Sequence, residues 1–293
     1  MSVRQETLQV ARLSPTLLGD SAGLVAEFVR ARLNPDGGFS NRAGDTDLYY
    51  TVFGLQALVA LRAELPVLPV TTYLRRFGDG EDLDLVHLAC LAGCWAMIRR
   101  TGLVPEVRQG ILDRIETFRT ADGGYHGSRE AACGSAYHAF LALGAYQDLG
   151  TAPRDPARVA ASLAALRSED GGFANERGRP RGSTPATAAA ATLIRHLDMP
   201  APPALADWLL ARCKQGGFFA SPDAPVPDLL STATALHALS SLHAPIDAIR
   251  EDCLDFVDSL WTSQGAFYGT WVDDTPDCEY TFYGLLALGH LAV

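Results

Sequence analysis

Asp36-Gly37-Gly38-Phe39 is the stretch that decides the fold, because close variants of it recur at four later positions. The variants are Asp122-Gly123-Gly124-Tyr125, Asp170-Gly171-Gly172-Phe173, Gln215-Gly216-Gly217-Phe218 and Gln264-Gly265-Ala266-Phe267. Successive copies are 86, 48, 45 and 49 residues apart, so the first gap has room for one further, degenerate copy. Internal repetition at such a period indicates an architecture made by stacking one supersecondary unit.

Each glycine turn, and the gap left for the degenerate copy, lies between two segments with helical patterns. The preceding segments carry apolar residues at helical spacing with charges on the other face, which predicts helices half-exposed on the outside. They span 22–33, 70–77, 107–118, 156–166, 204–212 and 248–261. The following segments are apolar nearly all round, which predicts buried inner helices. They span 50–61, 85–98, 135–146, 187–197, 229–242 and 280–291.

Six outer and six inner helices in strict alternation predict an all-α fold, an (α/α)6 toroid of six helical hairpins. Strand signals are weak, and the β-α-β alternation that would indicate an α/β barrel is absent. We expect a single domain over residues 1–293, with repeats at roughly 20–65, 67–101, 103–149, 154–198, 201–244 and 246–292. In this fold the inner helices run in one direction, so their N-termini surround one mouth of a central cavity.

Composition excludes several functional classes. The net charge is −10 and Lys214 is the only lysine, so the basic stripe that a nucleic-acid surface needs is missing. No apolar run is long enough to span a bilayer, and we expect no membrane span. The N-terminus lacks the pattern of a secretory signal, so we expect a cytoplasmic protein. The six cysteines fall mostly in helical patterns and are expected to be reduced.

Short polar side chains open most of the inner helices. Alignment of the copies on their Leu-x-Ala-Leu patterns gives six equivalent pentapeptides, at 47–51, 84–88, 132–136, 183–187, 228–232 and 277–281. Asp or Ser is the first residue of five of them, as expected for N-caps that accept the free N–H groups of the first helical turn. A ring of caps at the mouth can also line a site.

These residues carry a resemblance to a known superfamily. The repeats with Gly-Gly-Phe turns resemble those of protein prenyltransferase β subunits, such as that of geranylgeranyl transferase type II, and of squalene and terpene cyclases. EAACGSAYHA at 130–139 is similar to their E-x-D-x-R-S-A-Y-C-A run, and YTFYGLLAL at 280–288 is similar to Y-T-F-C-G-L-A-A-L. The resemblance covers residues 20–293. It implies a transferase or cyclase that handles an isoprenyl diphosphate or isoprenoid in an apolar cavity.

The zinc site implied by the resemblance is mostly missing. Prenyltransferases bind zinc through Asp-x-Cys in one pentapeptide and a His at the fourth position of the next. Asp228 matches the Asp, but Leu230 replaces the Cys and Tyr280 replaces the His. His87 alone takes a histidine position, and Cys133 and Cys278 are the remaining soft ligands predicted near the mouth. We therefore expect no cofactor, with a displaced zinc site as the open alternative.

Two groups of charged residues are candidates for chemistry. Class II cyclases of this superfamily carry D-x-D-D-T at the same helix start, and the resemblance places Glu279 at their proton-donating Asp, with Asp277 and Tyr280 beside it. Arginines on the loops of the third and fourth copies, with Arg42 of the first, form the second group; forked guanidinium groups bind phosphate well. The predicted diphosphate ligands are Arg129, Arg177, Arg179 and Arg181.

Three functions remain open from the sequence. The first is a prenyltransferase-like protein that handles an isoprenyl diphosphate with a degenerate zinc triad. The second is a small class II-type terpene cyclase that uses Glu279 as general acid. The third is a non-catalytic toroid that binds a peptide or protein. Prenyltransferase β subunits act with a helical α subunit, so a peptide or a helical partner subunit is a further expected partner, and nucleic acid is not.

Overall fold

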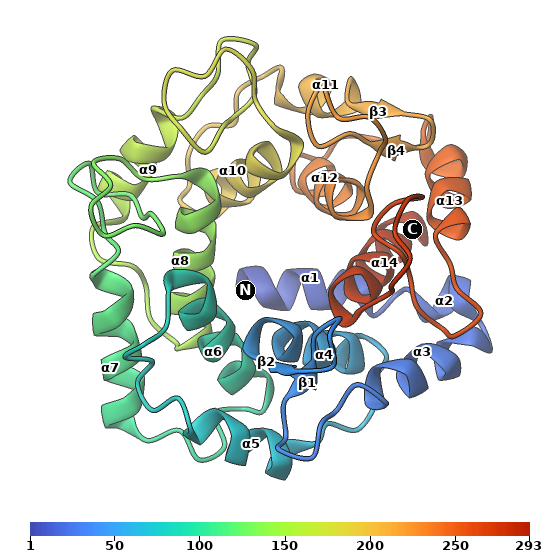
Figure 1. Cartoon of the computed structure of the whole chain (residues 1–293). Helices are drawn as coiled ribbons and strands as arrows, with labels where there is room; N and C mark the ends of the chain where they lie inside the picture. The colour runs from blue at the N-terminus through green and yellow to red at the C-terminus, as the bar shows by residue number, and fades with distance from the viewer.

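The chain forms a ring of paired helices around a central opening (Figure 1). The computed structural model describes residues 1–293. The outer helices are α3 (Ser21–Arg30), α5 (Val67–Arg75), α7 (Pro105–Glu116), α9 (Pro156–Ala164), α11 (Leu205–Leu210) and α13 (Arg250–Ser259). The inner helices are α4 (Leu48–Ala60), α6 (Leu85–Met97), α8 (Ala136–Asp148), α10 (Thr184–His196), α12 (Leu229–Ser241) and α14 (Cys278–Leu291). The predicted all-α toroid is confirmed.

The inner helices pack on one another around the ring, and α14 closes it against α4. Their apolarity on all sides follows from this position, since each is covered by two inner neighbours and by outer helices. Three of them begin two or three residues earlier than the pattern predicted, at Leu48, Thr184 and Cys278. The reason is capping: the polar residue before each of these positions ends the extended loop and starts the helix.

The glycine pairs allow the turns to lie close against neighbouring elements. Gly37 has φ +97°, and a Cβ there would lie 2.1 Å from the carbonyl oxygen of Pro69, on the next outer helix. Gly265 repeats the arrangement against Leu24 of α3, so the last turn closes the outer layer of the ring. Short strands mark two of the turns: β1 (Phe39–Ser40) pairs with β2 (Thr46–Asp47), and β3 (Cys213–Lys214) with β4 (Gly217–Phe218), both antiparallel.

The aromatic residue after each glycine pair is inserted beneath an inner helix. Phe39 lies against Gly54 and Phe267 against Gly284, where a Cβ would approach either ring to 2.5 Å. The backbone N–H groups of three of these phenylalanines donate to a threonine hydroxyl on the inner helix. The pairs are Phe39 with Thr51, Phe173 with Thr187, and Phe218 with Thr232, each at 2.9 Å. One buried hydrogen bond thus joins turn to helix in three repeats.

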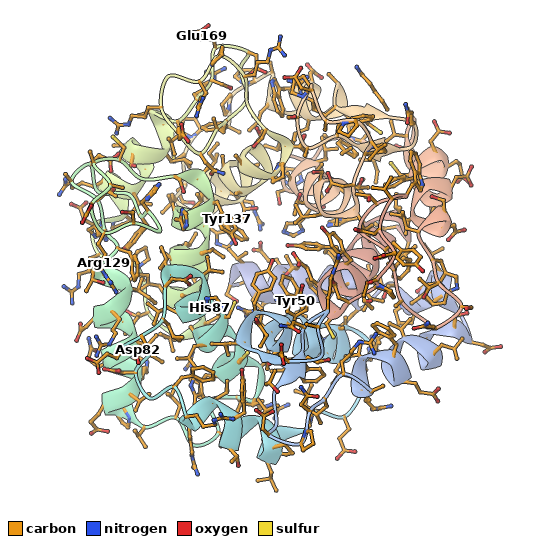
Figure 2. The ribbon with its side chains drawn as sticks, in the orientation of Figure 1. Tyr50, Asp82, His87, Arg129, Tyr137 and Glu169 are labelled. Atoms are coloured by element: carbon orange, nitrogen blue, oxygen red, sulfur yellow. The ribbon has the colours of Figure 1, made fainter.

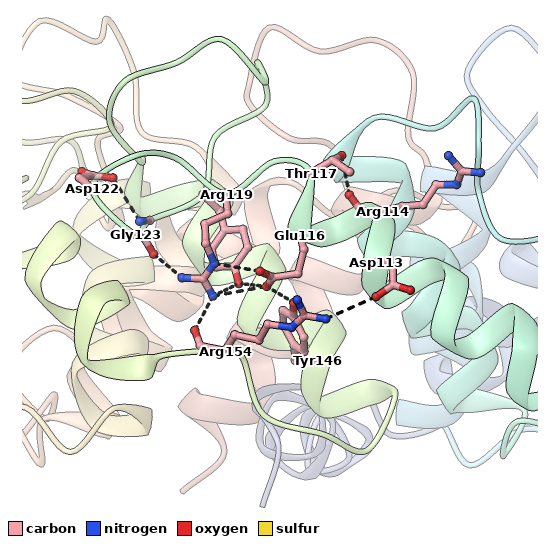
Figure 3. Close-up of polar contacts among 11 residues, drawn as sticks. Asp113, Arg114, Glu116, Thr117, Arg119, Asp122, Gly123, Tyr146 and Arg154 are labelled. Atoms are coloured by element: carbon pink, nitrogen blue, oxygen red, sulfur yellow. Dashed lines mark hydrogen bonds and ion pairs between the residues drawn. The ribbon is translucent and has the colours of Figure 1, made fainter.

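The third repeat uses a tyrosine in this place, and its hydroxyl needs a partner in the interior (Figure 3). Tyr125 donates to Glu116 Oε1 at 2.7 Å, and Tyr146 donates to the same oxygen. Arg119 donates to Glu116 Oε2 at 3.0 Å. Although burial acts to raise its pKa, these hydrogen bonds hold the pKa of Glu116 below its usual range. This network therefore provides the hydrogen-bond partners that the buried tyrosine of the third repeat needs.

Residues before the first repeat form two helices that the sequence pattern did not predict, α1 (Val3–Ala11) and α2 (Pro15–Leu18). Helix α1 begins with a capping box between Ser2 and Gln5, and it crosses behind the central opening in the view of Figure 1. It contacts the ends of the inner helices: Val3 N–H donates to the Gln147 side chain at 2.8 Å, and Gly289 packs against Val10. Helix α1 therefore closes the end of the ring away from the inner-helix N-termini.

No helix combines the length and apolarity required to cross a bilayer. All six cysteines are free thiols.

The buried threonine bond gives a test of the turn. Thr232→Val removes the acceptor of the Phe218 N–H without a change of shape, so we expect the free energy of unfolding to fall by about 1–3 kcal/mol. Thr281→Val is the matched control at the equivalent position, because the Thr281 hydroxyl is buried without a partner. Urea titrations should show the control unchanged or more stable; equal losses in both variants would contradict this role for the hydroxyl.

Candidate functional site

Six polar side chains cap the inner helices at one mouth of the ring. Each accepts a backbone N–H of its own first turn; the caps are Asp47, Asp84, Ser135, Ser183, Asp228 and Asp277. Five of these capping residues are the first residues of the predicted pentapeptides. In the third copy the predicted start at Ala132 is wrong by three residues, because Ser135 is the cap and Ala132 lies in the preceding loop.

The corrected third pentapeptide is Ser135-Ala136-Tyr137-His138-Ala139, which adds a second histidine at the fourth position beside His87. Both histidines interact with the cap of their own helix. His87 Nδ1 lies 2.8 Å from Asp84 Oδ1, and His138 Nδ1 lies 2.7 Å from Ser135 Oγ. Burial lowers the pKa of His138 to about 4. The predicted pentapeptide has Ser135 at the fourth position, so it does not reveal His138.

The inner helices enclose a cavity of about 430 Å³, within the range of small-molecule sites. The same positions of each inner helix form its wall. With the cap counted as the first residue, the third, sixth, seventh and tenth residues of a helix face inward. At the mouth the third residues are Tyr49, Val86, Tyr137, Pro185 and Leu230. In Figure 2, Tyr137 lies at the edge of the central opening. The middle of the wall is aromatic on three of the helices, through Phe53, Phe140, Phe282 and Tyr283, and the other helices present small side chains there.

Glu279 is the third residue of the sixth inner helix, and it continues the stripe of Phe282, Tyr283 and Leu286 toward the mouth. The Tyr49 hydroxyl donates to Glu279 Oε1 at 2.6 Å, which links the carboxyl group to the cavity wall. Burial raises the pKa of Glu279 to about 7, and the negative charge of Asp277 adds to the increase, while Tyr49 and Arg42 oppose it. A large share of this carboxyl group is therefore protonated at neutral pH.

Asp277 has a different environment from Glu279, two residues away. It caps α14 through the Tyr280 N–H at 2.9 Å, and Arg42 Nε donates to its other oxygen at 2.7 Å. Arg42 also lies 3.6 Å from Asp273 and 5.5 Å from the centre of the Tyr280 ring. Arg42 is thus paired with carboxylates, and Asp277 is fully engaged in structure. Burial raises the pKa of Tyr280 to about 12.

The residues at the implied zinc site do not fit the metal. Asp228 caps its own helix through the Ser231 N–H at 2.7 Å, Leu230 forms part of the apolar wall, and the third position is Tyr280. Cys278 is completely buried, and burial raises the pKa of its thiol to about 12, against the thiolate form that binds zinc. No three His, Cys, Asp or Glu side chains gather as a metal site would require. His87 interacts with Asp84 at the start of α6, and Cys133 lies in the loop before α8.

The four arginines predicted to bind diphosphate point to separate partners, and none lines the cavity. Arg177 pairs with Asp122 at 2.5 Å, Arg179 pairs with Glu176, and Arg181 with Asp223 at 3.2 Å. Arg129 stacks over Phe118 and lies toward the outer edge of the ring in Figure 2. Their role in diphosphate binding remains a prediction, and the geometry does not gather them into one anion site.

Comparison with known proteins identifies the family. A family model described as the prenyltransferase alpha-alpha toroid domain matches residues 18–91, 86–200 and 187–292. The chain belongs to the prenyltransferase alpha-alpha toroid family. No curated protein sequence matches it. The family model matches all six hairpins, so the resemblance of the turns and inner helices is confirmed.

Solved structures share the fold at low sequence identity. Protein geranylgeranyltransferase-I from Candida albicans, solved with GGPP, is 13% identical, with a TM-score of 0.67 over 92% of this chain and 90% of its own. The type II terpene cyclase MstE from Scytonema, solved with its substrate geranylgeranyl dihydroxybenzoate, is 13% identical, with a TM-score of 0.65 over 95% and 97%. An α-1,6-mannanase from Salegentibacter is 12% identical, with a TM-score of 0.63 over 94% and 98%. Fold alone does not choose among these chemistries.

The pKa of Glu279 can be tested through stability. A carboxyl group whose pKa is higher in the folded than in the unfolded state favours folding at low pH, and this contribution is lost as pH rises toward about 7. Glu279→Gln lacks the charge, so its stability relative to the wild type should rise by on the order of 1–3 kcal/mol between pH 5 and 8. Glu169→Gln changes an exposed glutamate and should show no such rise. Parallel curves for Glu279→Gln and the wild type would refute the raised pKa.

Proposed function

We propose that this protein is a cyclase that starts the ring closure of an isoprenoid polyene by proton transfer from Glu279. One observation carries the proposal: a carboxyl group with a pKa of about 7 adjoins an aromatic, apolar cavity through its bond to Tyr49. An acid can protonate an alkene only if it keeps its proton, and the partial burial of Glu279, which raises its pKa, favours the protonated form.

The proposed chemistry uses both oxygens of Glu279. Tyr49 donates to Oε1, so Oε2 is available to carry the acidic proton. Transfer of this proton forms a C–H bond with the alkene π electrons and leaves a tertiary carbocation; the O–H bonding pair stays on the carboxylate. The Tyr49 hydroxyl stabilises that carboxylate. The next double bond then attacks the cation and closes a ring, and loss of a proton to water or a base restores a neutral product.

The middle of the cavity suits such an intermediate. The rings of Phe53, Phe282 and Tyr283 contact one another, with centroids 5.5 to 6.3 Å apart. Aromatic faces stabilise cations by about 0.5–2 kcal/mol each without acting as nucleophiles. The two structural neighbours with isoprenoid ligands support a polyene as the class of substrate.

Prenyl transfer has less support from the same geometry. The metal positions hold Leu230 and Tyr280, and the loop arginines are paired with neighbouring carboxylates or stacked on an aromatic ring. No observation singles out a peptide groove for the third sequence-based hypothesis.

Glu279→Gln should lower the turnover of polyenes with farnesyl or geranylgeranyl chains by about 10²-fold to 10⁴-fold, the usual contribution of a general acid. The variant keeps an acceptor for Tyr49, so the fold should be preserved, as circular dichroism can check. Product would be measured by gas chromatography. Turnover that survives in this variant would eliminate Glu279 as the acid.

The pH profile is an independent test of the same residue. The wild-type rate should fall above about pH 7, because only protonated Glu279 can donate. Tyr49→Phe removes a hydrogen bond that favours the carboxylate, so the alkaline limb should move to higher pH while the rate falls. Tyr50→Phe is the matched control, since Tyr50 follows Tyr49 and does not bond to Glu279. An unmoved limb in Tyr49→Phe would contradict the proposed proton donor.

A further inference from the structure

Two cysteine side chains from neighbouring repeats lie in contact outside the cavity. Cys213 begins β3 in the turn of the fifth repeat, and Cys253 lies on α13, the outer helix of the sixth. Their Sγ atoms are 3.9 Å apart, although the two residues are 40 positions apart in the chain. Figure 1 shows β3 and β4 beside α13. The fold therefore brings together two thiols that the sequence gives no reason to pair.

Backbone packing holds the turn of the fifth repeat against α13. A Cβ on Gly216 would lie 2.3 Å from the backbone oxygen of Asp252, the residue before Cys253. A Cβ on Gly217 would approach the Phe256 ring to 2.8 Å. Because these contacts keep the turn on the helix, the sulfur atoms stay neighbours without a covalent bond. A disulfide bond is about 2 Å long, so the two atoms need to move together by about 2 Å, through rotation about the Cα–Cβ bonds.

The two thiols differ in exposure and in acidity. Cys213 is partly exposed, whereas Cys253 is completely buried. The hydrogen bond with Cys253 lowers the pKa of the Cys213 thiol, and the same bond, together with burial, raises the pKa of Cys253. The thiolate is the form of cysteine that attacks an oxidant. An oxidant from solution therefore reacts first with Cys213, and Cys253 lies next to the product.

We propose that Cys213 and Cys253 form an oxidative modification site, at which a hydroperoxide converts the two thiols into a disulfide bond. Cys213 is the attacking thiol and Cys253 is the resolving thiol. Neither residue lines the cavity, so the site is separate from the proposed cyclase chemistry. The bond would join the fifth turn covalently to the outer helix of the sixth repeat.

The oxidation passes two electrons from the sulfur atoms to the peroxide. The Cys213 thiolate attacks one oxygen of hydrogen peroxide, the O–O bond breaks, and the hydroxide that leaves takes up the proton that Cys213 released. The product is a sulfenic acid, whose sulfur Cys253 attacks. The S–O bond breaks as the S–S bond forms, and the second hydroxide takes the proton of Cys253. Two thiols and one peroxide thus give one disulfide and two waters, and a small dithiol reverses the change.

Treatment of the wild-type protein with hydrogen peroxide tests the site. We expect the intact mass to fall by two hydrogen atoms, and peptide mapping to find Cys213 joined to Cys253. The bond closes a loop across 40 positions, so the Tm should rise by about 5 °C and return to its first value after reduction with dithiothreitol. A gain of oxygen without a cross-link, or a disulfide between other cysteines, would overturn the proposal.

Serine variants test the pair and the order of attack. Cys213→Ser and Cys253→Ser should each lose the cross-link. Cys133→Ser is the matched control and should keep it, because Cys133 is partly exposed but is not one of the two thiols in contact. In Cys253→Ser the sulfenic acid should persist on Cys213, where dimedone traps it. Trapping on Cys253 in Cys213→Ser would reject the assigned order, and a cross-link that survives either substitution would reject the pair.

Discussion

The fold depends on the insertion of one aromatic ring beneath an inner helix in the turns of five of the six repeats. Phe39 and Phe267 lie against glycines of α4 and α14, and the equivalent inner-helix positions of three other repeats hold completely buried alanines, Ala142, Ala190 and Ala235. A larger side chain at these positions would push the turn away from the helix. The first glycine of each turn meanwhile allows contact with the next outer helix. Each turn thus holds together two layers and two neighbouring repeats.

The turns and inner helices are held in place by packing on their other faces. The side chains of the inward stripe are therefore available for binding or catalysis. The capping residues accept N–H groups of their own helices, so Asp228 and Asp277 are held at the helix starts. Glu279 is two residues farther along, on the face that continues into the cavity wall. Its environment, with Tyr49 as sole hydrogen-bond partner, differs from that of Asp277, which is paired with Arg42. Two neighbouring carboxyl groups thereby have different surroundings.

The cavity is polarised along its length. Glu279 stands at the mouth, aromatic side chains from three inner helices line the middle, and Gln56, Thr192 and His237 lie toward the far end. Helix α1 is essential to this arrangement because it brings Arg4 to Asp148 across the ends of the inner helices. Local sequence gives no sign of that role: the helix has an ordinary capping box and only a modest apolar face.

The repeat alone determined the architecture. Glycine pairs, helical periodicity and all-round apolarity are local signals, and packing leaves one way to stack six such hairpins. The sequence also placed Glu279 at a helix start, but its raised pKa depends on burial and on Tyr49, a residue 230 positions away. Likewise, the ion pairs of Arg177 and Arg181 and the insertion of α1 follow from contacts between distant segments. Only the tertiary structure decides these, because a side chain's charge state and partners are set by what surrounds it in space.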